Sequence, residues 1–421
     1  PNRFRHHVNP VDLVAAAVEP GADFNVEHVV VVRDDDRQGA APATSTAPLP
    51  SEAVQTPAAR HWTWRYYRAA IGAVDPDPQA IAARAPQPED ACQLLFTSGT
   101  TGEPKGVLHS NRALALATAL EVAHLGLGPA DRIYVPTPMA HQTGFLYGLM
   151  LSWRLGVPAV IQPVWDAGVA EAQAFGSAGA TFVQAATPFL SDLVKTVKDG
   201  TPRPESLRIF VATGAAVPRS LAKEAADVLD CAVLGAFGST ESCLGALGAP
   251  SDPPEEAWGS DGRALPGIRL RIRDDDGREV PAGREGNFEI DSPTLFLGYL
   301  ERPDLTAEVI TDDGWYRTGD LARLDEHGFL HISGRVKDVI NRGGEKIPVV
   351  EIENLLYQHP DIADVAIVAM PDPRLGERAC AFVVPQDGRR ITFAAMQHYL
   401  GEHGLSKYYW PERLEFIAEL P

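Results

Sequence analysis

Residues 94–110, LLFTSGTTGEPKGVLHS, place hydroxyl, glycine and lysine side chains directly behind an apolar run. Glycines leave backbone N–H groups open to a ligand, and the hydroxyls and the Lys105 ammonium add further donors that match the oxygens of a polyphosphate. A Walker A loop is excluded, because Pro104 stands where that motif needs the glycine before its lysine. A solvated turn is the alternative, and the density of donors favours a phosphate loop.

Two carboxylates follow other apolar runs. Glu241 in GAFGSTES is a natural Mg²⁺ ligand beside a bound polyphosphate, since this hard ion takes oxygen donors. The alternative for Glu241 is the first turn of a helix, where acidic side chains are favoured. Asp320 in YRTGDL follows a glycine and could accept both hydroxyls of a ribose, although turns commonly contain aspartate for other reasons.

The elements that must position these residues are short apolar runs alternating with helical stretches. Strands are predicted in RIYVPTP, PAVIQP, ATFVQA, LRIFVATG and CAVLGAFG, and helices in NRALALATALEVAHLG and PRSLAKEAADVLD. This alternation predicts an α/β fold in which helices cover mostly parallel sheets. Such sheets bind ligands at the carboxyl ends of their strands.

The pattern changes after Pro266. GIRLRIRDDDGREV alternates apolar and polar residues up to an Asp-Gly turn, and GNFEID is its expected antiparallel partner, so a β-rich subdomain follows the parallel sheets. From Pro348 a small α+β module is predicted, with a helix in PVVEIENLLYQHP that puts Ile352, Leu355 and Leu356 on one face, and strands in DVAIVAMPD, ERACAFVVPQ and ERLEFIAEL. We expect a large domain over residues 1–335 and a small one over 336–421. Residues 37–60 predict a surface loop.

Composition limits the function. The chain has 421 residues and a net charge of -19, which argues against nucleic acid or an anionic membrane as a partner. No apolar run approaches the roughly 20 residues that span a bilayer, and the start PNRFRHHVNP lacks a signal-peptide core. The cysteines have no C-x-x-C spacing and are expected to be reduced, mostly buried thiols in a cytoplasmic protein; they are Cys92, Cys231, Cys243 and Cys380.

Six motifs, taken in order, resemble the adenylate-forming superfamily of acyl-CoA synthetases, adenylation domains and luciferases. They are FTSGTTGEPKG, PMAHQTG, FGSTE, GNFEI followed by GYL, the run WYRTGDLARLDEHGFLHISGRVKDVINRGGEKI, and VEIE. The resemblance extends from about Asp90 to Pro421. It implies that a carboxylic acid attacks ATP to form an acyl-adenylate, and that coenzyme A then displaces AMP, with Mg²⁺ as the metal. Such chemistry depends on positioning and charge neutralisation, so no Ser-His-Asp nucleophile is expected.

The resemblance assigns roles to residues of this chain. Lys105, His141, Thr240 and Glu241 match catalytic positions, with Thr240 at the α-phosphate, Glu241 at Mg²⁺ and His141 at the junction of acyl pocket and thiol tunnel. Asp320 matches the ribose-binding aspartate, and Arg335 matches the arginine that reaches ribose or phosphate. The nucleotide-binding segments match Thr97, Ser98, Gly99, Thr100, Thr101 and Gly102, then Gly214, Ala215 and Ala216, then Phe237, Gly238 and Ser239.

The same comparison implies a moving small domain. Lys337 matches a hinge about which this domain rotates between the two half-reactions. Gly343, Gly344 and Glu345 match the stretch that lines the pantetheine tunnel after rotation. The family lysine that bridges acid and α-phosphate would follow FIAELP beyond Pro421, and family members carry more chain before the phosphate loop. We therefore expect this chain alone to adenylate poorly and a longer natural protein to be active.

The acid is predicted to be apolar, either aliphatic or ring-bearing, because four side chains lie near the expected acyl pocket: Phe145, Tyr147, Leu149 and Met150. Ordinary helix core is the alternative interpretation of these residues. The segment PMAHQTGFLYGL is similar to cyclohexanecarboxylate and medium-chain acyl-CoA ligases, which suggests fatty acid metabolism. Two other functions stay open: loading of a carrier-protein phosphopantetheine, and nucleotide binding without catalysis.

Overall fold

The computed structural model describes residues 28–31, 63–66, 85–97, 104–162, 164–214, 217–386 and 388–420. The chain forms two compact units, Pro1–Pro86 with Pro421, and Gln87–Leu420. The described residues of the first unit pair as two parallel strands, β1 (His28–Val31) and β2 (Thr63–Tyr66). The predicted loop over residues 37–60 lies outside the described residues.

A seven-stranded sheet forms the centre of the second unit, in the order β11-β10-β9-β8-β7-β5-β6. The five strands from β6 to β9 pair in parallel, as the apolar runs predicted, and the last two are antiparallel. The prediction of an α/β fold is therefore confirmed. The strands are β5 (Ile133–Val135), β6 (Ala159–Ile161), β7 (Phe182–Ala185), β8 (Ile209–Ala212), β9 (Ala232–Ser239), β10 (Cys243–Leu247) and β11 (Arg263–Ala264).

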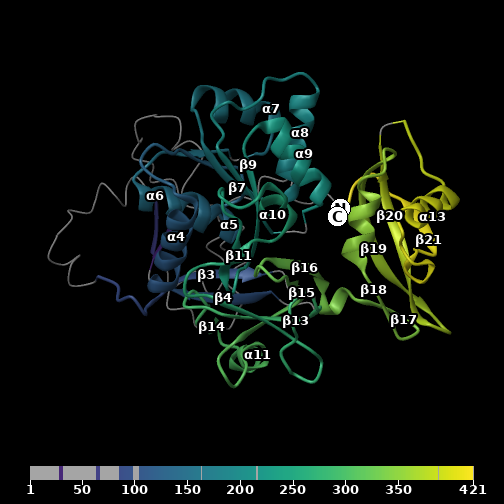
Figure 1. Cartoon of the computed structure of the whole chain (residues 1–421). Coiled ribbons are helices and arrows are strands. Elements are labelled where there is room, and N and C mark those ends of the chain that lie inside the picture. Colours follow the sequence, from purple (N-terminus) through teal and green to yellow (C-terminus); the bar gives the residue numbers. More distant parts are fainter. Residues whose placement is uncertain are drawn as a thin grey trace. The chain divides into compact units, whose positions relative to one another are not determined.

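Helices cover both faces of this sheet, with α4 and α6 on one side of β7 and β9 and with α8 and α9 on the other (Figure 1). Successive residues of β7 alternate between the two cores, because neighbouring strand side chains point to opposite faces. Phe182 packs in the core beneath α4, and Val183 packs in the core beneath α8. The helices are α4 (Asn111–Leu125), α5 (Gln142–Gly144), η3 (Phe145–Met150), α6 (Leu151–Leu155), α7 (Ala167–Val169), η4 (Ala170–Ser177), α8 (Thr187–Lys198), α9 (Arg219–Leu229) and α10 (Pro254–Gly259).

Two antiparallel sheets carry the remaining motifs. In the first, the order β14-β4-β3 places the GYL segment beside the strand that follows the phosphate loop. In the second, the order β12-β13-β15-β16 confirms the predicted pairing of GIRLRIR with GNFEID. The elements are β3 (Ala91–Thr97), β4 (Lys105–Ser110), β12 (Arg269–Arg273), β13 (Gly286–Asp291), β14 (Gly298–Tyr299), α11 (Pro303–Val309), β15 (Tyr316–Leu324) and β16 (Leu330–Arg335).

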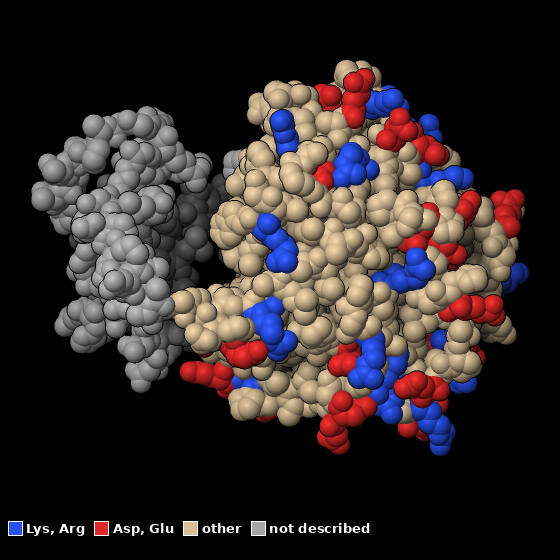
Figure 2. All heavy atoms as spheres, turned by 60° about the vertical axis from the view of Figure 1, so that its left-hand side comes forward, with Lys and Arg blue, Asp and Glu red and all other residues tan. Residues whose placement is uncertain are grey.

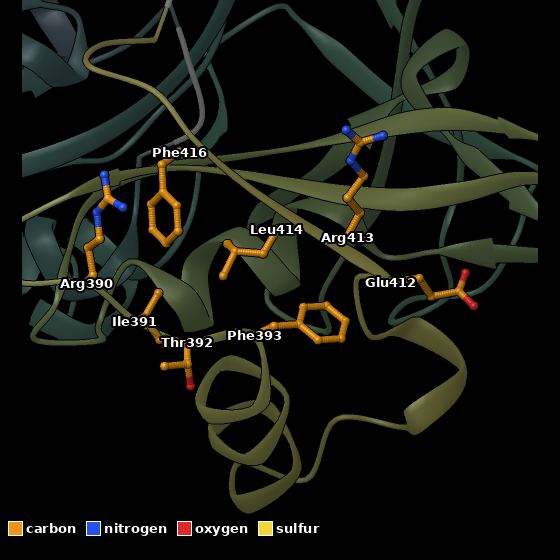
Figure 3. Close-up of a pocket in the computed structure, with 8 residues that line it drawn as sticks. All are labelled: Arg390, Ile391, Thr392, Phe393, Glu412, Arg413, Leu414 and Phe416. Carbon is orange, nitrogen blue, oxygen red and sulfur yellow. The ribbon is translucent and has the colours of Figure 1, made fainter.

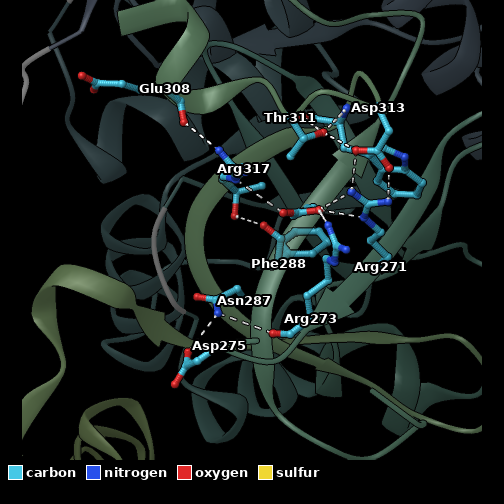
Figure 4. A network of polar contacts seen from close by, with 12 residues as sticks. Arg271, Arg273, Asp275, Asn287, Phe288, Glu308, Thr311, Asp313 and Arg317 are labelled. Carbon is cyan, nitrogen blue, oxygen red and sulfur yellow. Dashed lines mark hydrogen bonds and ion pairs between the residues drawn. The ribbon is translucent and has the colours of Figure 1, made fainter. Parts of the chain in front are cut away.

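A buried ion pair holds the second of these sheets together (Figure 4). Arg271 on β12 donates through Nε to Glu289 on β13, with a distance of 2.7 Å. The same guanidinium forms two bonds with Asp313, in the loop that leads into β15. Both side chains of the Arg271–Glu289 pair are under a tenth exposed, so its hydrogen bonds replace water that burial has removed.

The C-terminal module has an apolar core of its own, which includes Ile340, Ile352, Leu356 and Met396. The predicted helix and three strands of this module are confirmed, and the division at residue 335 stays a prediction. The elements are η5 (Val336–Asp338), β17 (Ile340–Arg342), β18 (Glu345–Ile347), α12 (Val349–Leu356), β19 (Ile362–Asp372), β20 (Gly376–Pro385), α13 (Phe393–Glu402), η6 (Lys407–Tyr409) and β21 (Arg413–Phe416).

The surface charges and the thiols agree with what the composition predicts, except for the exposure of Cys92. On the face in Figure 2, acidic and basic side chains are interspersed. Among the described residues, no helix is long and apolar enough to cross a bilayer. All four thiols are unpaired, and Cys243 and Cys380 are buried, but Cys92 is exposed, contrary to the expectation of mostly buried thiols. Cys92 lies on β3, where Ala91, Leu94 and Phe96 are exposed as well.

Glu353 makes the stability of the C-terminal module depend on pH. The Glu353 carboxylate on α12 accepts a bond from the Ile367 backbone N–H at 2.8 Å, and burial raises its pKa to about 7. The folded state then holds more protons than the unfolded state between about pH 4.5 and pH 7, so the free energy of unfolding falls as pH rises through this range. In Glu353→Gln we expect this fall in the free energy of unfolding to be smaller by about 2 kcal/mol. The value is lower than the full pKa shift of Glu353 implies, because the side chain is partly exposed.

Urea unfolding of the complete protein at about pH 5 and about pH 7.5 measures this difference. Glu351→Gln, at an exposed position on the same helix, is the matched control and should leave the pH dependence unchanged. Identical pH profiles for wild type and Glu353→Gln would contradict the prediction.

Candidate active site

The turn between β9 and β10 carries Thr240 and Glu241, and its sequence leaves little freedom. Ser239 and Ser242 bond each other, with the Ser242 N–H donating to the Ser239 hydroxyl at 3.1 Å and the Ser239 N–H to the Ser242 hydroxyl at 3.3 Å. Gly238 is required, because a Cβ there would lie 2.6 Å from the Cys243 carbonyl oxygen. The turn is closed by Cys243 itself, which has the unusual φ of 58°.

Side chains and backbone groups from other elements fix the two motif residues of this turn. The buried His109 ring on β4 donates from Nε2 to the Thr240 carbonyl at 2.6 Å. Burial lowers the pKa of His109, so the ring is neutral near pH 7 and its proton stays on Nε2. The Phe296 N–H donates to the Glu241 carbonyl, and the Tyr299 hydroxyl donates to the Glu241 carboxylate, both at 2.8 Å.

Lys105 and Glu241 lie on two sides of the same tyrosine. The Lys105 ammonium lies 5.0 Å from the centre of the Tyr299 ring, a distance at which a cation is attracted to the ring face. Lys105 is the first residue of β4 and pairs with Thr97, the last residue of β3. The two ends of the predicted phosphate loop are thereby placed, whereas Ser98, Gly99, Thr100, Thr101 and Gly102 lie outside the described residues.

A second tyrosine connects the β9–β10 turn to the YRTGDL motif. The Tyr316 hydroxyl bonds the Ser239 side chain and interacts electrostatically with Glu241 and Asp320, while burial raises the pKa of Tyr316 well above its ordinary value. Asp320 is buried four residues further along β15 and faces Arg335 of β16, whose Nε lies 3.3 Å from its carboxylate. Burial raises the pKa of Asp320, and the Arg335 charge opposes that rise.

The PMAHQTG motif and the helix after it contact the β9–β10 turn at Cys243 and Leu244. His141 caps the N-terminus of α5, where its Nδ1 accepts the Thr143 N–H at 3.2 Å, and partial burial lowers its pKa. The neighbouring Gln142 donates to the Cys243 thiol at 3.7 Å. The Tyr147 hydroxyl accepts the Leu244 N–H at 2.6 Å from within the core, so the core interpretation fits Tyr147.

The remaining predicted residues lie outside the β9–β10 turn. Phe237 packs edge-on against Phe288, with ring centres 5.0 Å apart. Gly214 has a φ of 86°, and the adjacent Ala215 and Ala216 lie outside the described residues. On the C-terminal module, the β17–β18 turn contains three predicted residues, of which the glycines have positive φ and the glutamate is exposed: Gly343, Gly344 and Glu345. Lys337 lies close enough for its charge to lower the pKa of Asp320.

Three residues that anchor the site were not predicted: His109, Tyr299 and Tyr316. Tyr299 and Tyr316 lie inside motifs that the sequence comparison used, GYL and YRTGDL, whereas His109 lies three positions beyond the end of FTSGTTGEPKG. The sequence therefore contained a signal for the two tyrosines, namely their residue type within a matched motif. Their function as hydrogen-bonding partners depends on the pairing of β14 with β4 and on a bond between β15 and β9, which no local pattern specifies.

The described chain contains other candidate sites, which are lined by residues other than Lys105, Glu241 and Asp320. One hollow of about 480 Å³ lies against β21 and the segment before α13 (Figure 3), and another of about 480 Å³ lies beside α10. Glu256, Asp325 and His331 bring ligand atoms within 4.8 Å of one another near the β15–β16 turn. The Asp325 carboxylate already accepts bonds from the His327 and Phe329 N–H groups and is bonded to His331. These bonds stabilise the β15–β16 turn and account for the position of Asp325 without a metal ion.

Comparison with known proteins decides the family. Residues 7–300 match the model of the AMP-binding enzyme, and residues 351–421 match the AMP-binding enzyme C-terminal domain. The chain belongs to the AMP-binding enzyme family. It is 35% identical over 336 residues to the Medium-chain fatty-acid–CoA ligase of Escherichia coli (strain K12), covering 79% of this chain and 59% of that protein. It is 35% identical over 338 residues to the Sulfoacetate–CoA ligase of Cupriavidus necator, covering 80% of this chain and 65% of that protein.

The chain thus spans less than two thirds of the length of these two relatives. Among solved structures, it is similar to ATP-bound MatB from Rhodopseudomonas palustris, with a TM-score of 0.77, 25% identity, and coverage of 94% of this chain and 76% of that one. It is also similar to the anthranilate CoA ligase AuaEII in complex with anthranoyl-AMP, with a TM-score of 0.72, 27% identity, and coverage of 80% and 65%. The resemblance inferred from the motifs is confirmed at the level of family and fold.

The Tyr299 hydroxyl provides a test of the site geometry. Tyr299→Phe keeps the ring beside Lys105 and removes only the bond to the Glu241 carboxylate. We expect the affinity of the complete protein for ATP in the presence of Mg²⁺ to fall about 10-fold, because a hydrogen bond to a charged group is worth roughly 1.5–3 kcal/mol. Isothermal titration calorimetry measures this change.

Tyr408→Phe, at an exposed tyrosine, is the control and should bind as wild type does. Repeating the titration with Mg²⁺ chelated should abolish the difference between Tyr299→Phe and wild type, if Glu241 acts through the metal. Equal affinities of the two proteins in the presence of Mg²⁺ would rule out this function of Tyr299.

Proposed function

We propose that the chain belongs to an acid–thiol ligase that activates a small carboxylic acid with ATP and transfers the acyl group to coenzyme A. The observation that supports this most is the convergence of Lys105, Glu241 and Asp320, which come from three separate motifs and three sheets, around the hydroxyls of Tyr299 and Tyr316. A cation, a carboxylate and a buried ribose-type aspartate around one turn suit a polyphosphate nucleotide. The CoA ligases among the relatives agree with this proposal.

In the first step, an oxygen of the acid attacks the α-phosphorus of ATP, the bond from that phosphorus to the bridging oxygen breaks, and pyrophosphate leaves. Lys105 would hold the departing pyrophosphate, since negative charge increases there as the bond breaks. Thr240 would contact the α-phosphate through its hydroxyl or N–H, because its carbonyl is already engaged by His109. No side chain needs to act as a covalent nucleophile.

Glu241 fits a magnesium ion by its donor type and by its surroundings. Tyr299 bonds Oε1, and Mg²⁺ prefers oxygen ligands shared with phosphates. When bound, the metal would neutralise phosphate charge. The protein's own contribution is to hold the carboxylate in one orientation, through the Tyr299 hydroxyl on its side chain and the Phe296 N–H on its backbone.

Asp320 and Arg335 would bind the ribose. A buried carboxylate with a raised pKa favours a neutral hydrogen-bonding partner, and the hydroxyls of a ribose supply donors to it. Arg335 is half-exposed and lies 3.3 Å from Asp320, so it can keep the carboxylate ionised and still reach a phosphate. Adenine would then lie near Phe237 and Gly214, as the motif comparison predicts.

In the second step, the sulfur of coenzyme A attacks the acyl carbon and AMP leaves. We assign His141 to the junction between acid and thiol, Lys337 to the hinge, and the β17–β18 turn to the pantetheine tunnel. The positive φ values of Gly343 and Gly344 support the last assignment, because a backbone without Cβ atoms allows a ligand to approach closely. The acid itself is proposed to be largely apolar, either aliphatic or ring-bearing.

The function of Lys105 is tested by Lys105→Ala in the complete protein. We expect single-turnover formation of the acyl-adenylate to slow by roughly 10²–10³-fold, with acid binding changed by less than about 3-fold, because the ammonium stabilises charge that develops in the transition state. Rapid-quench detection of the adenylate and calorimetry of acid binding separate the two quantities.

Lys195→Ala, at an exposed position on α8, is the control for loss of a surface charge and should react as wild type does. An unchanged single-turnover rate in Lys105→Ala would contradict the proposed function of this residue. Failure of every acid to drive ATP–pyrophosphate exchange in the wild-type protein would contradict the proposed reaction itself.

A further inference from the structure

Three buried polar side chains near α5 and η3 lack hydrogen-bond partners within the described part of the chain. Gln184 has neither its amide oxygen nor its amide nitrogen bonded, Gln142 lacks a partner for Oε1, and Glu121 lacks one for both carboxyl oxygens. All three residues are at most 5% exposed. Most buried polar groups in folded proteins are paired, because removing them from water without a partner is costly.

The fold brings these three residues to one segment. Strand β7 contacts both α5 and η3, and α4 contacts η3. Gln184 lies at the carboxyl end of β7 on the same face as Phe182, since side chains alternate along a strand, and that face packs in the core with Tyr147 of η3. Gln142 is the first residue of α5, and Glu121 interacts with Tyr147 from α4.

This location is where a ligand of the sheet is expected. Ligands of parallel α/β sheets bind at the carboxyl ends of the strands, where Gln184 lies. Gln142 follows His141, which the proposed function assigns to the junction of acid and thiol. The η3 turn has π-helical geometry, which is frequent at functional sites.

A small shift of the helix would not supply the missing partners. Gly144 and Gly148 already allow the closest approach, because a Cβ at these positions would lie 2.4 Å from the Pro138 carbonyl oxygen and 2.6 Å from a Val135 methyl group. The segment is therefore seated directly against β5 and the loop after it. Among the described residues, no packed side chain supplies a partner for the Gln184 amide.

We propose that Gln184, assisted by Gln142, binds a neutral hydroxyl group on the acid, so that the substrate class is a hydroxy-substituted carboxylic acid. This inference rests on the proposed function and refines its largely apolar acid. A hydroxyl both donates and accepts, so it satisfies the oxygen and the nitrogen of one amide together. Val211, the β8 partner of Gln184, provides an apolar neighbour for the hydrocarbon part of the acid.

A second carboxylate on the acid fits this location less well. Glu121 lies on the same side of the sheet, and burial raises its pKa well above the ordinary value, which favours the neutral carboxyl over the carboxylate. A buried anion beside it would have no described Lys or Arg bonded to these three side chains to compensate its charge. A neutral substituent avoids that cost.

The test compares matched acids in ATP–pyrophosphate exchange with the complete protein. The pairs are benzoate with its meta- and para-hydroxy derivatives, and a medium-chain fatty acid with its omega-hydroxy derivative. We expect the wild-type protein to favour at least one hydroxy acid over its parent by roughly 10- to 100-fold in kcat/KM, because the parent leaves the buried amide unpaired. Gln184→Leu, which removes the amide at similar volume, should reduce this ratio to about one.

Two controls separate binding from structure. Gln173→Leu makes the same chemical change at an exposed position on η4 and should keep the wild-type ratio. The Tm of Gln184→Leu should not fall, since no described hydrogen bond is lost. A lower Tm with an unchanged ratio would show a structural role for Gln184 and overturn the proposal.

Calorimetric measurement of the binding of each acid pair tests recognition of the hydroxyl by Gln184 separately from the proposed adenylation reaction. If no acid drives exchange but the hydroxy acids still bind more tightly than their parents in a Gln184-dependent way, the reaction is wrong and the inference holds. If the parents bind and react as well as every hydroxy acid, the inference is overturned and the reaction stands.

Discussion

The β9–β10 turn is the constraint on which the rest of the site depends. Residues 239–244 are bonded by five residues from three parts of the fold: His109 on β4, Tyr147 on η3, and Thr294, Phe296 and Tyr299 in the segment that ends in β14. Each bond fixes a carbonyl, an N–H or the Glu241 carboxylate. Because so many groups are fixed, Thr240 and Glu241 can project from a turn with a strained Cys243 backbone and still have defined positions.

Tyrosines perform most of this fixation, and their chemistry explains why. A phenol ring packs in an apolar core while its hydroxyl reaches a polar group at the edge of that core. Tyr147 and Tyr299 are under a tenth exposed, yet each hydroxyl is bonded to the turn or to Glu241. Tyr299 also presents its ring to the Lys105 ammonium, so one side chain relates the phosphate loop to the proposed metal ligand.

The sequence predicted the parts of this arrangement that depend on local pattern. Apolar runs such as ATFVQA and LRIFVATG became β7 and β8, and the Asp-Gly turn after GIRLRIR led to the paired strands β12 and β13. Lys105, Glu241 and Asp320 were recognised because each lies in a motif directly behind or within a strand. Such features need only neighbouring residues to be interpreted.

What the sequence did not predict depends on contacts between distant segments. His109 is separated from Thr240 by 131 positions and Tyr299 from Glu241 by 58, so residue type alone could not identify these bonds. The same holds for Gln184, which occupies a core-facing position in a strand that was correctly predicted. Whether a buried amide is bonded or unpaired depends on what the other elements place opposite it, and this information is absent from the strand pattern.

Paired and unpaired polar groups are distributed unequally, and this contrast bears on where the ligand binds. Away from the turn, the buried Arg271 is bonded to Glu289 and Asp313, and Arg219 is bonded to Asp261. Around α5 and η3, Gln142, Gln184 and Glu121 keep buried atoms without described partners. A sequence that pairs the buried Arg271 with two carboxylates has no need to leave an amide unpaired where leucine would fit the same core. Other buried side-chain atoms of the described residues also lack a partner, among them Arg273 Nε on β12 and Ser333 Oγ on β16. Gln184 differs from these because neither atom of its amide is bonded and because it lies at the end of the sheet where ligands bind, which is best explained by a partner that arrives with the substrate.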